Sequence, residues 1–394
     1  MEGADALPEF ADYYRQIYAL GLAGEQPSIP VAVEELERAA REAMEPHAAA
    51  YVFAGAGSCE TMTANREAFR RWRIVPRMLR DVSARDLSTS VCGTRLPAPL
   101  LLAPIGVQKI VHEQGELASA RAAAKLGLPI VVSSASAFTL EEIAEANGDG
   151  PRWYQLYWVN DDELVQSLVS RAEAAGYSAL VLTVDTFIPG WKPMDLQQAW
   201  LPFLEGLGNA NYLQDPVFRA QLAKPPEEDL GAAIGHWLSI YDNPGLSWVD
   251  LGRLQGMTEL PILIKGIQRA DDARRALEQG AEGVIVSNHG GRQLDGALGS
   301  LEALPGVVEA VGDRIAVLFD SGVRNGADAY KALALGARAV CLGRPYLWGL
   351  ALEGTDGVEK VLRMLLAELD LTLALSGYRN PSELDRDALV RVAA

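Results

Sequence analysis

The segment SNHGGRQLD, residues 287–295, carries the side chains best suited by type and spacing to catalysis. His289 ends a predicted buried strand, two glycines then free the backbone, and Arg292 follows three residues after the histidine. This spacing can bring a general base and a carboxylate-binding cation to one small substrate. A metal site is the alternative role for the pair. The other three histidines, His47, His112 and His236, lack ligand spacing, so the sequence predicts acid–base chemistry and no metal.

Polar residues also end most of the other apolar runs of the sequence. Each one alone has an ordinary structural explanation, such as a lysine snorkelling from a strand end or a carboxylate that caps a turn. Together they favour a site, because the strand ends of a barrel converge on one mouth. The residues concerned are Ser133, Gln155, Tyr157, Thr183, Asp185, Lys265, Asp320, Arg324 and Arg344.

The elements that must position these residues are eight short apolar runs separated by Ala-rich amphipathic segments. This alternation is typical of parallel strands joined by helices. Because the runs are apolar almost throughout, both faces of the sheet are expected to be buried. The predicted strands are 96–106, 128–136, 152–158, 179–186, 260–267, 283–288, 315–320 and 339–343.

The predicted fold class is α/β, a closed (β/α)₈ TIM barrel rather than an open doubly wound sheet. No GxGxxG or GxxxxGK[ST] motif follows any of the strands. Residues 1–95 are expected to form an N-terminal helical cap within the same domain, and residues 96–394 the barrel. The connection 187–245 after the fourth strand is rich in proline and tryptophan, and its length predicts a lid.

Composition limits the classes of partner. The chain has 394 residues, 49% of them hydrophobic, and a formal net charge of −17. This charge disfavours nucleic acid and anionic membranes as partners. The three scattered cysteines and the absence of an apolar leader or spanning run predict a cytoplasmic protein.

A phosphate site is predicted after the last two strands, at SGVRNG and LGRP. Glycines there allow backbone N–H groups to approach an oxyanion, while Arg324 or Arg344 pairs with it. Barrel phosphate sites usually lie at this place in the fold.

The chain resembles the FMN-dependent L-2-hydroxy acid oxidising enzymes. The matching segments are SNHGGRQLD, SGVRNG, LGRP, APIGVQKI, YQLYW, LTVDT and LPILIKGI. That family includes glycolate oxidase, lactate oxidase and mandelate dehydrogenase. The resemblance extends from about Tyr51 to the end of the sequence, and the long fourth connection is most similar to that of lactate 2-monooxygenase. It implies an FMN cofactor and a homo-oligomer, a tetramer or larger.

The resemblance also implies a role for each matching residue. His289 would be the base, with Asp185 orienting its ring and Lys265 offsetting charge on the reduced flavin. Arg292 and Lys192 would bind the substrate carboxylate, with hydroxyls from Tyr51 and Tyr157. FMN would contact Pro104, Ile105, Gly106, Ser133, Gln155, Thr183 and Lys265, and its phosphate would lie near Asp320, Gly322, Arg324, Gly343 and Arg344.

Two positions depart from the family pattern. Lys192 stands where the family has a second carboxylate-binding arginine, so the planar guanidinium fork is lost while the charge is kept. Ala135 stands where plant glycolate oxidases have tryptophan, which leaves more room beside the substrate. The second difference favours lactate or a bulkier acid over glycolate.

The expected reaction is that of a lactate 2-monooxygenase, lactate and O₂ giving acetate, CO₂ and water. One alternative is an oxidase that releases the keto acid and H₂O₂. A dehydrogenase for a bulkier, aryl 2-hydroxy acid is another. Two further alternatives leave this chemistry altogether: a non-catalytic flavin- or phosphate-binding barrel, and an aldolase that uses Lys265 as a Schiff-base amine.

Overall fold

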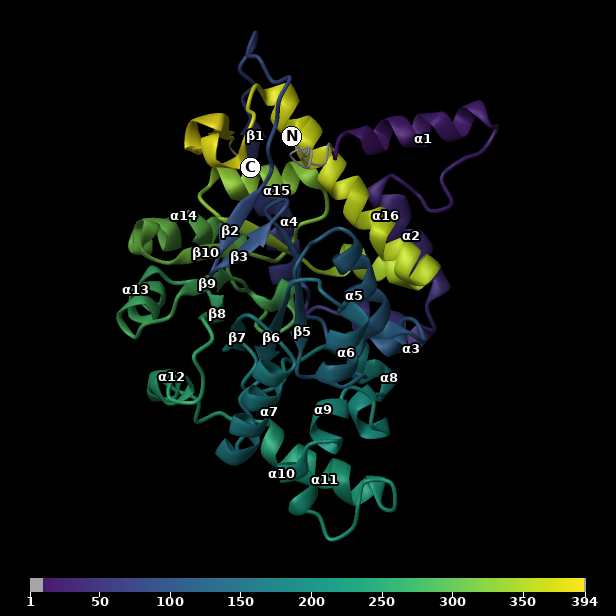
Figure 1. Ribbon diagram of the computed structural model, residues 1–394, viewed down its shortest axis with the longest axis vertical. Coiled ribbons are helices and arrows are strands. Elements are labelled where there is room, and N and C mark those ends of the chain that lie inside the picture. Colours follow the sequence, from purple (N-terminus) through teal and green to yellow (C-terminus); the bar gives the residue numbers. More distant parts are fainter. Residues whose placement is uncertain (1–9, 393–394) are drawn as a thin grey trace, which may run out of the picture.

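A computed structural model describes residues 10–392 of the chain. Four helices precede the barrel (Figure 1): α1 (Asp12–Leu22), α2 (Val33–Ala43), α3 (Pro46–Phe53) and α4 (Glu60–Arg70). Helices α1 and α2 pack against the long helix α16 (Arg344–Ser376), which is interrupted at Glu353 and Gly354. Within residues 10–392, no helix combines the length and the apolar content that crossing a membrane requires.

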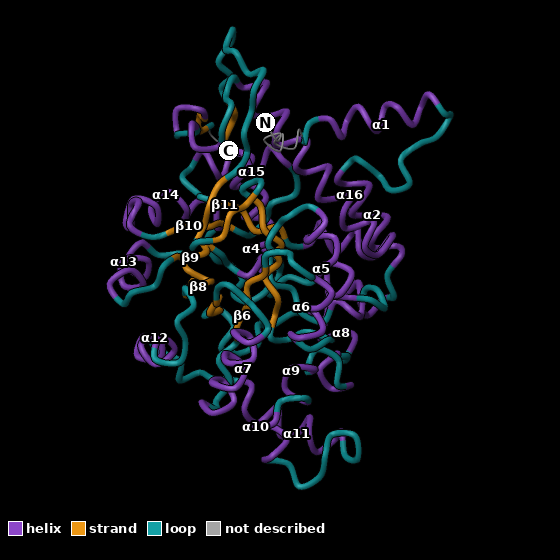
Figure 2. The backbone as a smooth tube through the Cα atoms, in the orientation of Figure 1, coloured by secondary structure: helices purple, strands orange, loops and turns teal. Residues whose placement is uncertain are grey.

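The centre of the molecule is a closed barrel of eight parallel strands, which confirms the predicted fold class (Figure 2). Each observed strand lies inside one of the predicted runs, and the last, β11, pairs with the first, β4. The strands are β4 (Leu100–Leu102), β5 (Ile130–Ser133), β6 (Arg152–Leu156), β7 (Leu180–Thr183), β8 (Ile262–Ile267), β9 (Gly283–Val286), β10 (Ala316–Phe319) and β11 (Ala339–Leu342).

Helices surround the barrel and alternate with its strands along the chain. Several of them begin at side chains that cap free N–H groups: Thr139 and Glu142 form a capping box on α6, and Asn325 caps α15. The helices are α5 (Gly115–Lys125), α6 (Leu140–Asn147), α7 (Asp162–Ala174), α13 (Ala270–Glu278), α14 (Ser300–Val311) and α15 (Gly326–Ala334). Short 3-10 turns lie at Gln108–Ile110, Pro202–Glu205, His289–Gly291, Gly312–Arg314, Pro381–Glu383 and Arg386–Ala388.

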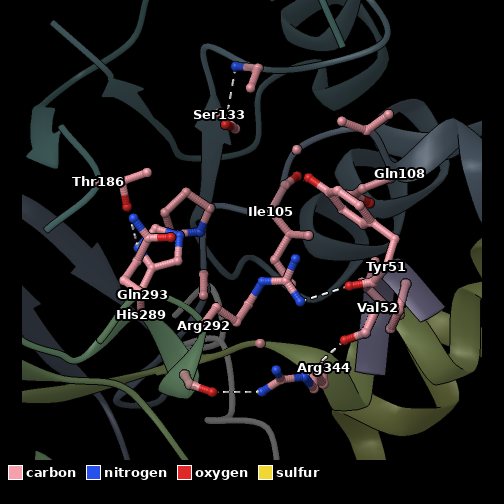
Figure 3. Close-up of a pocket in the computed structure, with 18 of the residues that line it drawn as sticks. Tyr51, Val52, Ile105, Gln108, Ser133, Thr186, His289, Arg292, Gln293 and Arg344 are labelled. Carbon is pink, nitrogen blue, oxygen red and sulfur yellow. Dashed lines mark hydrogen bonds between the residues drawn. The ribbon is translucent and has the colours of Figure 1, made fainter. Parts of the chain in front are cut away.

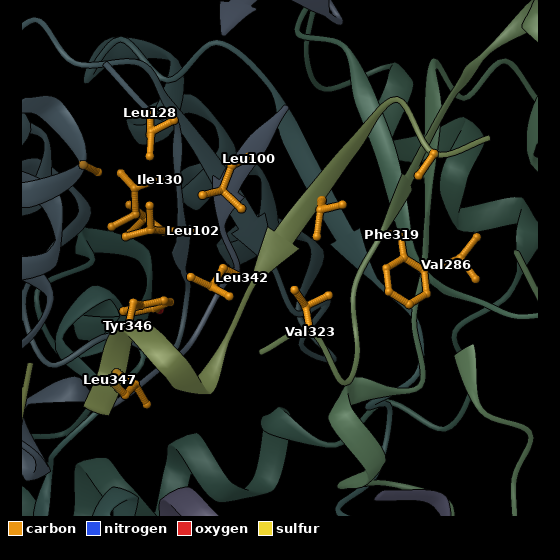
Figure 4. Packing of buried hydrophobic residues seen from close by; sticks show 14 of the residues in the cluster. Leu100, Leu102, Leu128, Ile130, Val286, Phe319, Val323, Leu342, Tyr346 and Leu347 are labelled. Atoms are coloured by element: carbon orange, nitrogen blue, oxygen red, sulfur yellow. The ribbon is translucent and has the colours of Figure 1, made fainter. Parts of the chain in front are cut away.

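The core has two layers, because alternate side chains of a strand face opposite sides. Leu100 and Leu102 belong to a cluster that includes residues of the surrounding helices. Figure 4 shows part of this cluster, with Tyr346 from α16. Leu101, between them, belongs to a second cluster with Trp153 and Ile285, contributed by other strands of the barrel. All these residues are fully buried, and each buried leucine contributes about 1.5–3 kcal/mol of transfer free energy.

Two small antiparallel sheets were not predicted. Strands β2 (Thr89–Val91) and β3 (Thr94–Leu96) form a hairpin, and β1 (Trp72–Ile74) pairs with β12 (Leu389–Arg391). The first barrel strand was therefore predicted to begin four residues too early, since Leu96 belongs to β3. Pro97 and Pro99 separate the two strands and cannot donate to a ladder.

We call residues 187–245 the lid segment. It consists mainly of short helices: α8 (Pro193–Gln198), α9 (Ala210–Leu213), α10 (Pro216–Ala220) and α11 (Leu230–Tyr241). Its aromatic residues Tyr212, Phe218 and Trp237 are almost fully buried and belong to the hydrophobic cluster that includes residues of the barrel. Helix α12 (Trp248–Gln255) then leads back to β8.

Candidate active site

The C-terminal ends of the barrel strands surround a cavity of about 290 Å³. Helix α3, the strand-end loops and the lid segment all contribute to its wall (Figure 3). All the residues predicted from the sequence to form the site line this cavity except Asp185, Gln155 and Thr183. These three contact or neighbour lining residues, so the fold brings the whole predicted set together.

His289 lies at the cavity with both ring nitrogens close to polar groups. Its Nδ1 is 2.7 Å from Oδ1 of Asp185 and 3.0 Å from the Thr186 hydroxyl, and its Nε2 is 3.5 Å from the Tyr157 hydroxyl. Burial raises the pKa of Asp185, but His289 and Lys265 lower it by more, so this carboxyl stays ionised. An ionised carboxylate accepts a hydrogen bond from Nδ1–H, which orients the ring and leaves Nε2 available to accept a proton.

The backbone at His289 has an unusual conformation that glycine makes possible. His289, Gly290 and Gly291 have φ values of 58°, 65° and 75° in succession. At Gly291 a Cβ atom would lie 2.7 Å from the backbone nitrogen of Met62, so a larger residue would push α4 away from this turn. The turn thereby brings both His289 and Arg292 to the cavity.

Arg292 is held by the backbone of helix α3. Its Nη1 donates to the carbonyl of Tyr51, at 2.7 Å (Figure 3), and to that of Ala54, at 2.9 Å. Its guanidinium lies over the Tyr51 ring. Lys192, from the lid segment, lines the same cavity and donates to the Gly190 carbonyl. Burial and the charge of Arg292 lower the pKa of Lys192. Two cations at one cavity suit an anionic substrate.

Lys265 is a buried lysine at the end of β8. Its Nζ lies 3.2 Å from Oδ2 of Asp320 and donates to the Ser287 hydroxyl at 2.9 Å. Burial lowers the pKa of Lys265, but Asp320 and Asp185 raise it by more, so the ammonium stays charged. Asp320 thus pairs with Lys265 rather than with Arg324 or Arg344, the cations of the predicted phosphate site.

Arg324 and Arg344 line the cavity, are partly buried, and form no ion pair within residues 10–392. Burial lowers the pKa of Arg324 to about 10, and burial also lowers that of Arg344. Arg344 donates to the backbone carbonyls of Val52 on α3, of Ala54 directly after it, and of Gly290. Partly buried cations that lack a carboxylate partner are stabilised when an anion binds. This part of the cavity therefore fits the phosphate of FMN.

The rest of the predicted cofactor site also fits FMN, a ligand rich in hydrogen-bonding atoms. Gln155 Nε2 and Thr183 Oγ1 are buried and have no partner within the described residues. Gln155 accepts from Ser133, and Thr183 is in register with Lys265. Such orphaned groups cost free energy unless a ligand satisfies them. The backbone of Pro104, Ile105 and Gly106 lines the cavity beside them.

The structure also shows functional candidates that the sequence reasoning missed. Thr186 contacts His289, while Ser287 and Ser321 bond to the backbone around it. Each of the three lies one or two positions from a predicted site residue in the sequence. Their contacts with His289 and its neighbours become visible only in the folded structure. The lid residue Asp195 is nearly buried, and both its carboxylate oxygens lack a partner within residues 10–392.

The lid segment contributes an apolar wall to the cavity. Phe203 stacks on Trp237 with ring centroids 5.3 Å apart, and Trp237 lies 4.3 Å from Tyr241. Ala135 lines the cavity as well and adds little volume. The cavity thus offers cations for an acid group and apolar surface for a side chain.

Comparison with known proteins agrees with this site. A family described as FMN-dependent dehydrogenase matches residues 40–391. An FMN-dependent alpha-hydroxy acid dehydrogenase of Schizosaccharomyces pombe is 46% identical over 96% of each chain. An L-lactate oxidase of Lysinibacillus sphaericus is 44% identical over 93% of this chain and 94% of its own. The crystal structure of a mandelate oxidase superposes with a TM-score of 0.82 at 37% identity, covering 93% of this chain and 99% of the other.

Proposed function

Because this chain belongs to the FMN-dependent dehydrogenase family, whose relatives oxidise 2-hydroxy acids, we propose that it oxidises an L-2-hydroxy acid and passes the electrons to O₂. It is an FMN-dependent 2-hydroxy acid oxidoreductase, and the acceptor, the substrate and the residue roles are the proposal. The observation that carries it is the contact between Asp185 and His289, beside the cation Arg292.

In this proposal, Nε2 of His289 takes the proton that the substrate loses. The charge that then develops on the imidazole is stabilised by Asp185, 2.7 Å from Nδ1. The Tyr157 hydroxyl, 3.5 Å from Nε2, is placed to bind the substrate alcohol. Bound FMN supplies an acceptor for the two electrons.

Arg292, Lys192 and the Tyr51 hydroxyl would bind the substrate carboxylate. The arginine is positioned before substrate arrives, because two backbone carbonyls of α3 already fix one of its nitrogens. The Lys192 ammonium carries a positive charge but cannot form the two parallel hydrogen bonds of a guanidinium. Its attraction for the substrate carboxylate therefore depends on distance more than on orientation.

The residues proposed to hold FMN are Lys265 and Ser133 with the backbone at 104–106, and Gln155 and Thr183 with their free polar atoms. Arg324, Arg344 and the backbone at Gly322 and Gly343 would hold its phosphate. Lys265 would offset negative charge gained on reduction, because Asp320 and Asp185 keep it protonated.

For the fate of the product, we propose the reaction of a lactate 2-monooxygenase. Lactate and O₂ would give acetate, CO₂ and water, with pyruvate and peroxide reacting before release. The lid segment supports this, because Lys192, Leu201 and Phe203 line the cavity and the segment is anchored in the core through buried aromatic residues.

A second candidate is the oxidation of a bulkier 2-hydroxy acid, such as an aryl one. The aromatic wall of Phe203, Trp237 and Tyr241, facing the small Ala135, favours it. In that case the keto acid would leave the site intact, with O₂ or a quinone-type compound as acceptor.

One anaerobic experiment tests the proposal. The FMN-loaded protein is mixed with L-lactate, glycolate and L-mandelate, and the yellow absorbance is followed. Bleaching by a 2-hydroxy acid is expected; no bleaching would favour a non-catalytic barrel. With oxygen admitted, acetate from lactate supports the monooxygenase, whereas pyruvate with H₂O₂ identifies an oxidase.

The proposed setting is the cytoplasm, with the chain as a homo-oligomer. The three cysteines are free in the structure, which agrees with a reducing compartment. Light scattering of the purified protein would give its mass, and a monomer would contradict the homo-oligomer.

A further inference from the structure

Ser321 has a backbone conformation that serine rarely adopts. It follows β10 with φ of 87°, in the region where a Cβ atom is strained and glycine is the ordinary choice. The residue is 7% exposed and lines the cavity. Backbone strain of this kind persists only where surrounding interactions hold it, and it clusters at functional sites.

The Ser321 hydroxyl uses its full hydrogen-bonding capacity. It donates to Oδ1 of Asp320 at 2.7 Å, and it accepts from the backbone nitrogens of Asn288, at 3.2 Å, and Gly290, at 3.1 Å. A hydroxyl has one donor and two acceptor positions, so all three are filled. The two amides are those on either side of His289.

The same hydroxyl connects the His289 turn to Lys265. Asp320 pairs through its other oxygen with Lys265, which in turn donates to the Ser287 hydroxyl, and that hydroxyl accepts from the backbone nitrogen of His289. A closed chain of bonds thus links the turn, which contains three successive residues with positive φ, to the buried lysine.

We propose that Ser321 is a positioning residue for the base: its hydroxyl fixes the backbone on both sides of His289 and thereby aims Nε2 at the substrate. The inference rests on the proposed role of His289. Substrate binding should depend on Ser321 much less, because helix α3 holds Arg292 independently through the carbonyls of Tyr51 and Ala54.

The variants Ser321→Ala and Ser321→Gly separate positioning from stability. Both remove the hydroxyl, but glycine also relieves the strain at φ of 87°, so Ser321→Gly should melt at a higher temperature than Ser321→Ala. If the Ser321 hydroxyl positions His289, the two variants should oxidise the substrate equally slowly. Ser376→Ala is the matched control: it removes a buried hydroxyl that donates to the Thr372 carbonyl at the end of α16.

Two measurements on the FMN-loaded proteins follow. In the anaerobic reaction, the limiting rate of flavin bleaching should fall about tenfold or more in both Ser321 variants, the effect of one or two lost hydrogen bonds, with the half-saturating substrate concentration nearly unchanged. Hydrogen exchange at the amides of Asn288 and Gly290 should become faster in both, while exchange in β10 stays slow. Ser376→Ala should match the wild type in both measurements.

The inference is overturned if Ser321→Gly reacts as fast as the wild type, or if the two amides exchange at the wild-type rate. A wild-type protein that no 2-hydroxy acid bleaches would instead refute the proposed function. In that event the amide exchange still decides whether Ser321 fixes the turn.

Discussion

Nδ1 of His289 lies 2.7 Å from Oδ1 of Asp185, although the two residues are 104 positions apart in the sequence. The other carboxylate oxygen, Oδ2, has no partner within the described residues. His289 is therefore the ring that this carboxylate contacts, and the Thr186 hydroxyl lies within hydrogen-bonding distance of both groups.

Replacing His289 by alanine should leave FMN binding intact and slow substrate oxidation by a factor of ~10²–10⁴ or more, the usual range for a general base. The cofactor contacts proposed here do not involve the imidazole. Anaerobic stopped-flow absorbance measures the rate, and the flavin-to-protein ratio serves as the control. Rapid bleaching in this variant would remove His289 from the mechanism.

Asp185→Asn should lower the rate and also change how stability depends on pH. Although burial opposes it, the net effect of His289 and Lys265 is a pKa of Asp185 below its ordinary value. A carboxyl with a lowered pKa stabilises the fold above its unfolded pKa of about 3.9 and loses this contribution as the pH falls through the folded value. The melting temperature of the wild type should exceed that of Asp185→Asn by most near neutral pH. The difference should become smaller below about pH 4.

Glu116 gives the opposite pH dependence. It is buried, and its Oε1 accepts from the backbone nitrogens of Ala137 and of Gln108, a residue that lines the cavity. Burial raises the pKa of Glu116 to about 7. A raised pKa stabilises the fold below the unfolded value of about 4.3, and the contribution is lost as the pH rises towards 7.

Glu116→Gln keeps an acceptor and removes the titration. The stability that the wild type loses between about pH 4 and 7, on the order of 2–3 kcal/mol, should therefore be retained in the variant. Melting temperatures across this pH range measure the effect. Glu116→Ala, which lacks the acceptor, should be destabilised at every pH; parallel curves for wild type and Glu116→Gln would contradict the prediction.

Lys192→Arg should tighten substrate binding. A guanidinium can bind a carboxylate through two parallel bonds, so KM for L-lactate should fall by roughly threefold to tenfold. Lys192→Met, which keeps the length of the side chain without its charge, should raise KM. If neither change alters KM for any 2-hydroxy acid, Lys192 does not bind the substrate carboxylate.

The barrel was predictable because its strands are buried on both faces. Runs such as LPILIKGI are continuously apolar up to the polar residue that ends them, and that end marks the mouth of the barrel. The count of eight strands located the predicted residues that lie at strand ends. Tyr51 and Lys192, which lie outside the strands, came only from the resemblance to the family.

The remaining structure depends on contacts that sequence spacing does not encode. Nothing local to Trp72 indicates that it pairs with Arg391. The lid helices, several only four to six residues long, are stabilised by packing around Trp237 and so give little periodic signal. Ser321 resembles an ordinary turn residue until its bonds to the neighbouring loop are visible.

The pairing of β4 with β11 has a consequence for how the molecule forms. Leu100 meets Val340 in this ladder, so the first barrel strand lacks its second neighbour until nearly all of the barrel sequence has been synthesised. Folding is slow when it depends on contacts between such distant segments, and the edges of the strands stay exposed until those contacts form. Refolding from denaturant should accordingly be slow and lose material to aggregation, and the nucleotide can be captured only after the ring of strands has closed.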